Sequence, residues 1–272
     1  MPTKTVNGVD LFYDESGSGE PIIFHHGYTG SHDSWAGVVE RLQDRFRCVV
    51  MDGRGAGDSA HPDGGYTIEQ MAADVVGMAD ALGIDRFTYV GHSMGGVMGM
   101  ELGLAHAERL SKLVLVAPAP ADGVERGEED HARARRLWAE KARDTLISER
   151  IATTARESAH ANVPGGVDRA LSVSEGHYDD CWDALVTYQK GERLQEITTP
   201  TLMIAGSADS LLAANLLDFQ RLPNATLHVF SRVSHGVARE VAAAFARVLA
   251  DFMEHGVVTS ATLQEALPAA VR

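Results

Sequence analysis

A serine at a glycine-flanked turn is the feature that most limits what this chain can fold into. Residues 91–96 are Gly-His-Ser-Met-Gly-Gly; they follow the apolar run 87–90 and precede a stretch with helical character. Gly91 and Gly95 lie where the backbone turns so tightly from strand to helix that larger side chains would collide. Such a turn holds Ser93 in a strained conformation, with its hydroxyl beyond the sheet edge. The pattern predicts a nucleophile rather than an ordinary Gly/Ser turn.

A serine hydroxyl needs a neighbouring base, and that base needs an orienting group. Residues 201–205 are typical of a buried strand and are followed by Asp209, whereas residues 226–230 are typical of a second strand and are followed by His235. Because parallel sheets place their sites beyond the carboxyl ends of the strands, we expect Asp209 to orient His235, the general base. The alternatives are that Asp209 only caps the next helix, that His235 is an ordinary loop histidine, and that Asp122 supplies the acid.

A second loop is suited to binding a developing negative charge. Residues 21–25 are typical of a strand, and a glycine-bounded loop follows at 26–30. Acyl transfer needs two donors aimed at the reacting oxygen. We expect these donors to be the backbone N–H groups of Tyr28 and Met94, with Gly27 allowing the loop to bend under the substrate.

The neighbouring histidines His25, His26 and His32 raise the question of a metal site. Adjacent histidines in a strand should point to opposite faces, and we identify no carboxylate or cysteine at ligand spacing around them. We therefore predict no metal. The serine chemistry outlined above needs no cofactor either, so none is predicted.

Taken together, these motifs resemble the α/β-hydrolase fold family from about Val6 to about Glu254. The segment Asp52–Ser59 is similar to the family's D-x-R-G-x-G-x-S segment, and residues 66–74 resemble the helix start that follows it. We expect Asp52–Ser59 to be structural, with Arg54 pinning the loop. The resemblance implies an α/β fold: a mostly parallel eight-stranded sheet flanked by helices, with an inserted helical lid.

The chain departs from the family pattern before its general base. The family's usual Gly-His is Ser234-His235 here, with Gly236 after the histidine. This difference concerns the local backbone and leaves the role expected of His235 unchanged.

Strand and helix patterns divide the chain into three parts. Residues 1–118 and 197–256 alternate predicted strands and helices and form the hydrolase core, with a last helix at about 237–254. Residues 119–196 are charged and helix-prone, without a convincing strand, and we interpret them as a helical lid (cap) interrupted by residues 163–166. Residues 257–272 form a C-terminal tail with a weakly amphipathic stretch at 263–267.

The lid is expected to enclose a substrate of limited size and to set specificity. At least half of its large apolar side chains should form its own core, and its histidines His131, His160 and His177 should face solvent. The remaining large side chains should face the substrate. Our candidate pocket residues are His92 beside the nucleophile and, from the lid, Trp138, Tyr178, Trp182 and Tyr188.

Charge and cysteine content limit the classes of binding partner and the cellular location that we expect. The formal net charge of −14 argues against nucleic acid or an anionic membrane as a partner. The two cysteines form no disulfide framework, and no apolar run approaches membrane-spanning length. The sequence thus predicts a cytoplasmic protein acting on a small molecule, and it leaves a homo-oligomer open.

The leading function is hydrolysis of a small to medium carboxylic ester through Ser93, His235 and Asp209 and an acyl-enzyme. Fold and triad serve other reactions equally well: lactone hydrolysis, amide hydrolysis, perhydrolysis by a cofactor-free haloperoxidase-like enzyme, and C–C hydrolysis of diketone-like compounds. C–C hydrolysis is less favoured, because family members of that type often have Asn where this chain has His92. A non-catalytic small-molecule receptor is the least favoured interpretation.

Overall fold

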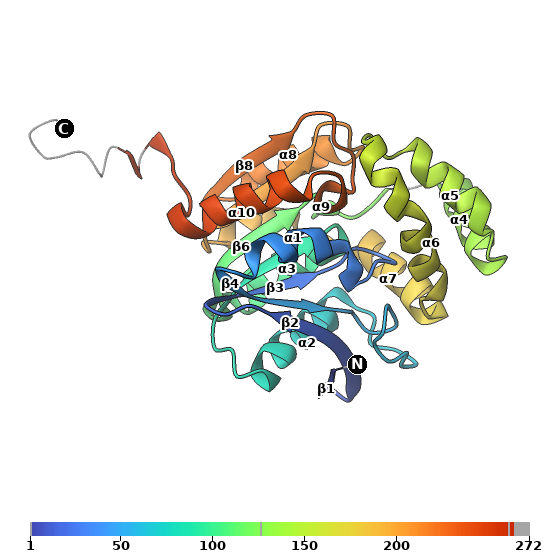
Figure 1. The fold of residues 1–272 in the computed structure, drawn as a ribbon, viewed down its shortest axis with the longest axis horizontal. Coiled ribbons are helices and arrows are strands. Elements are labelled where there is room, and N and C mark those ends of the chain that lie inside the picture. Colours follow the sequence, from blue (N-terminus) through green and yellow to red (C-terminus); the bar gives the residue numbers. More distant parts are fainter. Residues whose placement is uncertain (1, 126, 261, 264–272) are drawn as a thin grey trace, which may run out of the picture.

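An eight-stranded sheet runs through the centre of the molecule (Figure 1). The computed structural model describes residues 2–125, 127–260 and 262–263. The strands lie in the order β1-β2-β4-β3-β5-β6-β7-β8. The pairs β1–β2 and β2–β4 are antiparallel, and every other neighbouring pair is parallel. The strands are β1 (Thr3–Val6), β2 (Val9–Ser16), β3 (Glu20–His25), β4 (Phe46–Met51), β5 (Phe87–His92), β6 (Leu110–Val116), β7 (Thr201–Gly206) and β8 (Ala225–Phe230).

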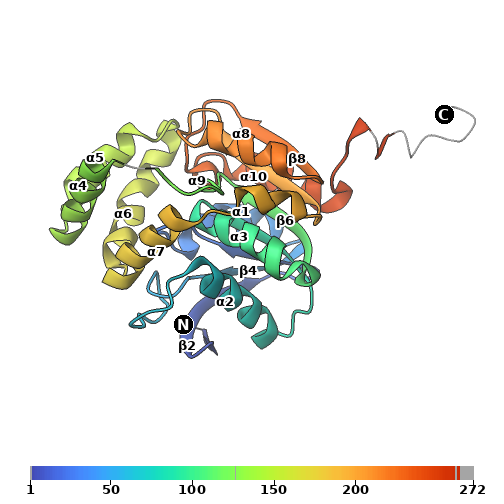
Figure 2. The ribbon, with the colours of Figure 1, turned by 180° about the vertical axis from the view of Figure 1, so that it is seen from behind.

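Helices cover both faces of the sheet, as Figures 1 and 2 show from opposite sides. One layer contains α1 (Ala36–Leu42), α9 (Val237–Glu240) and α10 (Ala242–His255). The other contains α2 (Ile68–Ala81), α3 (Met94–Ala105) and α8 (Leu212–Arg221). Two separate apolar clusters, one beneath each layer, fill the space between helices and sheet. The central strands are therefore buried on both faces, which explains their continuous apolar sequences. The predicted α/β class, a mostly parallel eight-stranded sheet flanked by helices, is confirmed.

Helices also make up the segment between β6 and β7. It contains α4 (Glu128–Ala139), α5 (Arg143–Ala152), α6 (Val163–Ser172) and α7 (Glu175–Thr187), with short 3-10 turns at Glu157–Asn162 and Gly191–Glu196. Helices α4 to α6 project from one end of the sheet in both views (Figures 1 and 2). No strand occurs among the described residues of this segment. That it acts as a lid stays a prediction.

Two local predictions need correction. Residues 163–166 do not interrupt the helices but form the first turn of α6. Backbone N–H groups in the first turn have no acceptor within the helix, so the proline at 164, which has no N–H, loses no hydrogen bond there. The predicted last helix is two helices, since Val241, with φ −138° and ψ 39°, departs from helical geometry and separates α9 from α10. Most of the amphipathic stretch 263–267 lies outside the described residues. No helix in the described ranges is long and apolar enough to cross a membrane.

Candidate active site

The turn at Ser93 has the strained geometry that its glycines predict. Ser93 joins β5 to α3 with φ +54° and ψ −112°, a conformation rare for a residue with a side chain. A Cβ on Gly91 would lie 2.1 Å from the carbonyl oxygen of Gly95, and a Cβ on Gly95 would lie 2.7 Å from that of His26. Hydrogen bonds fix the turn, because the Ser93 N–H donates to Val116 at 3.0 Å. No residue larger than glycine fits at position 91 or 95 without moving the backbone.

The acid and the histidine expected to assist Ser93 are hydrogen-bonded to each other. Asp209 follows β7, His235 follows β8, and His235 Nδ1 lies 2.8 Å from Asp209 Oδ2. The end of β7 allows this approach: a Cβ on Gly206 would lie 2.4 Å from the Val233 carbonyl oxygen, so only glycine lets the second loop cross there. The Ala208 N–H donates to the same carbonyl at 2.9 Å.

The environment of Asp209 keeps its carboxylate charged. Burial raises the pKa of Asp209, but the hydrogen bond and charge of His235 and the N–H of Leu211 outweigh burial and lower it below its ordinary value. The side chain of His235 is 40% exposed and that of Asp209 only 1%. The carboxylate is thus held in the interior while the imidazole reaches the surface of the site. The rival acid Asp122 instead pairs with Arg221 at 2.6 Å.

His92 connects the serine turn to the histidine loop. Its ring centroid lies 4.7 Å from that of His235, and its Nε2 lies 2.9 Å from the His235 carbonyl oxygen. Burial and the neighbouring His235 ring lower the pKa of His92 to about 3. His92 is therefore neutral at pH 7, and Nε2 must carry the proton that it donates to the carbonyl. In the described chain the Ser93 hydroxyl makes no hydrogen bond, so its contact with His235 stays a prediction.

The loop at residues 26–30 lies directly against Ser93. A Cβ on Gly27 would be 2.9 Å from Ser93 Cβ and 2.9 Å from His92 Nδ1. His26 holds this loop in place, since its Nδ1 donates to the Gly27 carbonyl at 2.8 Å and its Nε2 accepts the Gly53 N–H at 2.9 Å. The backbone that carries Tyr28 is therefore fixed beside the serine.

His25 and His26 do not point to opposite faces as expected. Their ring centroids lie 4.6 Å apart in a stacked arrangement. The expectation was wrong because β3 ends at His25, so strand alternation does not extend to His26.

The aromatic residues predicted for the pocket divide into two groups. Tyr28 lies 5.6 Å from Tyr178 and 5.8 Å from Trp182, measured between ring centroids. Trp138 stacks on Tyr178 at 4.5 Å, and its indole N–H donates to the Ala170 carbonyl. These four rings form one cluster across the 26–30 loop, α4 and α7. Tyr188 lies apart from it in the larger core, with its hydroxyl bonded to Glu101 at 3.3 Å.

The expectation that His177 faces solvent was wrong. Its side chain is fully buried under α7, 6.2 Å from the Tyr28 ring in a parallel arrangement. Burial lowers the pKa of His177 to about 4, and Nδ1 donates to the Arg54 carbonyl at 2.8 Å. His177 shares one face of α7 with the buried Cys181 and Leu185, four and eight residues further on, and this spacing is the sequence signal that could have placed it inside.

One group of side chains in the described chain has the composition of a metal site. Ligand atoms of His32, Asp52 and Asp58 lie within 4.8 Å of one another. However, Asp52 already accepts hydrogen bonds from the His32 N–H, the His32 ring and the Asp58 N–H. Asp58 also pairs with the cation of Arg169 at 2.9 Å. These contacts make the group a structural anchor. The predicted pinning role of Arg54 is confirmed by its two bonds to Asp74, at 2.7 and 2.8 Å.

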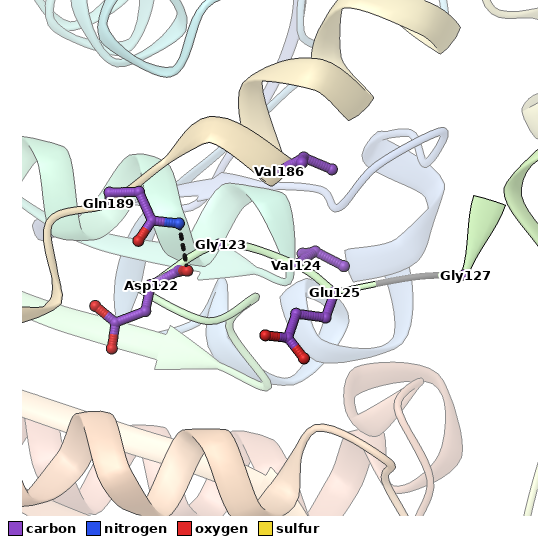
Figure 3. A pocket seen from close by; sticks show the side chains of 7 residues that line it. All are labelled: Asp122, Gly123, Val124, Glu125, Gly127, Val186 and Gln189. Atoms are coloured by element: carbon purple, nitrogen blue, oxygen red, sulfur yellow. Dashed lines mark hydrogen bonds between the residues drawn. The ribbon is translucent and has the colours of Figure 1, made fainter.

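A cavity of about 460 Å³ opens where the inserted helices join the core (Figure 3). Gln189 crosses its wall and donates to the Asp122 carbonyl at 2.6 Å, as the dashed line shows. None of the predicted catalytic residues borders this cavity. It is lined by Asp122, Gly123, Val124, Glu125, Gly127, Val186 and Gln189.

A model of the alpha/beta hydrolase fold family matches residues 20–238. The chain belongs to the α/β-hydrolase fold family. A protein of Azorhizobium caulinodans provisionally assigned as a carbamate hydrolase is 30% identical over 270 residues, covering 90% of this chain and 98% of the relative. The 3-oxoadipate enol-lactonase 2 of Acinetobacter baylyi is 30% identical over 223 residues, covering 76% and 79%. The crystal structure of an enol-lactonase from Burkholderia xenovorans LB400 has a TM-score of 0.81 at 26% identity and covers 93% of this chain and 100% of its own.

The family assignment makes the chain an enzyme, and one contact in this α/β-hydrolase was not foreseen from its sequence. The buried carboxylate of Glu240 accepts the Ser234 N–H at 3.0 Å, the Ser234 hydroxyl and the Arg156 N–H at 3.0 Å. It thereby joins the loop that carries His235 to the inserted helices. The only sequence signal was Ser234 itself, which stands where the family usually has glycine.

Proposed function

We propose that this α/β-hydrolase is a serine hydrolase that cleaves a small to medium carboxylic ester. The observation that carries the proposal is the hydrogen bond between His235 and the buried Asp209 beside the strained turn of Ser93. A lowered pKa of Asp209 and an exposed imidazole are what a base and its orienting acid need. The reaction needs no group beyond these side chains and backbone donors.

In the proposed first step, His235 Nε2 takes the proton of Ser93 as its oxygen attacks the ester carbonyl. Asp209 keeps Nδ1 protonated and stabilises the imidazolium that forms. The tetrahedral oxyanion accepts hydrogen bonds from the backbone N–H groups of Tyr28 and Met94. His235 then returns its proton to the leaving alcohol, and an acyl-enzyme remains on Ser93.

In the second step water replaces the alcohol. His235 removes a proton from the water as it attacks the acyl carbon, and the same two N–H groups stabilise the second oxyanion. The C–O bond to Ser93 breaks, His235 protonates the serine oxygen, and the carboxylic acid leaves. We propose that α4 to α7 form the lid over this reaction and that the aromatic cluster of Tyr28, Tyr178 and Trp182 borders the substrate.

A lactone is the second candidate substrate. Two of the similar proteins are named as enol-lactonases, one of them at 30% identity. A lactone is a cyclic ester, so the same steps open its ring and leave the alcohol attached to the product.

Hydrolysis of p-nitrophenyl esters from acetate to decanoate, by wild type and by Ser93→Ala, tests the proposal. We expect wild type to hydrolyse these esters with an optimum at one chain length. The rate of hydrolysis by Ser93→Ala should be lower by at least about 1000-fold. Full activity in Ser93→Ala would refute the proposed mechanism. If wild type hydrolyses none of these esters, the same pair of proteins is assayed with small lactones, and inactivity there too would refute the function.

A further inference from the structure

We propose that Arg150 and Arg239 bind a carboxylate on the substrate, so that the enzyme prefers esters or lactones bearing a second, free carboxylate. The inference rests on the proposed ester hydrolysis and specifies its substrate class. It is carried by two arginine side chains that meet between the inserted helices and the core.

The two guanidinium groups reach the same glycine from different elements. Arg150 comes from α5 and Arg239 from α9. A Cβ on Gly166 in α6 would lie 2.7 Å from Arg239 Nη1 and 3.8 Å from Arg150 Nη1. The missing Cβ of Gly166 therefore leaves room for the Arg239 guanidinium, the Arg150 guanidinium lies within contact distance of the same point, and both side chains are partly buried.

Neither cation has a carboxylate partner among the described residues. Other arginines of the inserted helices do, for example Arg143 with Asp168 at 2.6 Å. Arg239 instead donates to the hydroxyl of Ser34 at 2.7 Å. The charge of Asp33 raises the pKa of Arg239, but this carboxylate already pairs with Arg169 at 2.8 Å.

The arrangement is electrostatically unfavourable without an anion. Burial lowers the pKa of both Arg150 and Arg239, and the charge of Arg150 lowers that of Arg239 further. Gly166 also lies in the first turn of α6, where the helix dipole is positive. A carboxylate placed between the two guanidinium groups would offset their repulsion and raise both pKa values, because guanidinium forms paired, charge-assisted hydrogen bonds with it, and the dipole of α6 would add to the attraction.

The position fits a group on the substrate that is hydrolysed at Ser93. Arg239 lies four residues beyond His235 in the sequence, and its charge contributes to lowering the pKa of His92. His92 adjoins Ser93 in the chain and His235 in space. The protein has a net charge of −14, so a local pair of cations would favour an anionic substrate group at a place where the overall charge opposes it.

The test compares charged and neutral esters that are otherwise matched. The substrates are 4-nitrophenyl hydrogen succinate, glutarate and adipate, and the methyl ester of each. We expect wild type to prefer the acid over its methyl ester by at least about 10-fold in kcat/KM for one chain length. Equal kcat/KM for acid and methyl ester at every length, or a preference for the methyl ester, would overturn the proposal.

Variants then test whether the two arginines cause the preference for the acid over its methyl ester. Arg150→Met and Arg239→Met should each lower kcat/KM for the preferred acid by about 10- to 100-fold and leave that of its methyl ester within about twofold. Arg239→Lys keeps the positive charge, so its kcat/KM for the preferred acid should lie between those of Arg239→Met and wild type. The matched control is Arg143→Met, which removes an exposed arginine of α5 and should change neither substrate.

Failure of the inference is distinguishable from failure of the proposed function. Equal losses on acid and methyl ester in Arg150→Met and Arg239→Met would show a structural role for the arginines and overturn the inference, although hydrolysis would still depend on Ser93. Hydrolysis of the methyl esters by Ser93→Ala at the wild-type rate would instead refute the mechanism.

Discussion

Replacing Glu240 with alanine is expected to destabilise the protein strongly, although this residue contacts no predicted reacting atom. Its carboxylate is buried and accepts the Ser234 N–H at 3.0 Å, the Arg156 N–H at 3.0 Å and the Ser234 hydroxyl. Glu240→Ala leaves two backbone donors without partners. Because each unsatisfied buried donor costs about 1–3 kcal/mol, the free energy of unfolding should fall by about 2–6 kcal/mol.

Glu240→Gln provides a finer test. The amide keeps the volume and one acceptor oxygen but loses the charge, so we expect a smaller loss of about 1–3 kcal/mol. Urea unfolding followed by fluorescence and circular dichroism measures both values, and an unchanged m-value would show that the unfolding reaction is the same. The matched control is Glu254→Ala, because that side chain is 60% exposed and its loss should cost less than about 0.5 kcal/mol.

The same variant should also affect catalysis, since Ser234 directly precedes His235. In Glu240→Gln we expect kcat on a p-nitrophenyl ester to fall while KM changes little, because the base moves and the pocket does not. The reasoning is refuted if Glu240→Ala destabilises the protein by less than about 1 kcal/mol, since its buried donors would then have other partners.

Three further perturbations test other contacts. Asp209→Asn should lower kcat by about 10,000-fold while circular dichroism stays unchanged, and a loss below about tenfold would exclude an orienting role. Gly91→Ala would place a methyl group 2.1 Å from the Gly95 carbonyl oxygen, so it should abolish activity and lower Tm, whereas wild-type values would contradict the turn geometry. Burial lowers the pKa of His32, but its hydrogen bond and charge attraction with Asp52 outweigh burial and raise it. The stability that His32 contributes is fully present when the pH is below its unfolded-state pKa of about 6.5. This contribution is lost as the pH rises through the higher pKa of the folded state. His32→Gln should therefore cost more stability at about pH 5.5 than at about pH 8.5, and an equal cost at both would contradict this linkage.

The site residues that could be predicted from the sequence are each identified by residues next to them in the chain. The glycines around Ser93 indicate a tight turn by themselves, because their positions are set by local sterics. Asp209 and His235 each follow a strand that its own residues identify, and parallel topology then brings the two loops together at one sheet edge. Their hydrogen bond was predictable for this reason.

The contacts that sequence did not predict join distant segments. Glu240 meets Arg156 from the inserted helices, and Arg150 meets Arg239 only because α5, α6 and α9 pack together. The packing of inserted helices on a core follows from the sum of many weak side-chain contacts, which leaves no periodic signal. Gly166 illustrates the difficulty, since a glycine that accommodates a guanidinium has the same local sequence signature as one that interrupts a helix.

Covalent labelling tests the central claim, that Ser93 is a nucleophile activated by His235, most directly. Wild type, Ser93→Ala and His235→Ala are incubated with a fluorophosphonate, and intact mass and peptide mapping follow. We predict one adduct on Ser93 in wild type, none in Ser93→Ala, and labelling slowed by at least about 100-fold in His235→Ala. Labelling of Ser93→Ala at the wild-type rate, or an adduct mapped to another residue, would contradict the account.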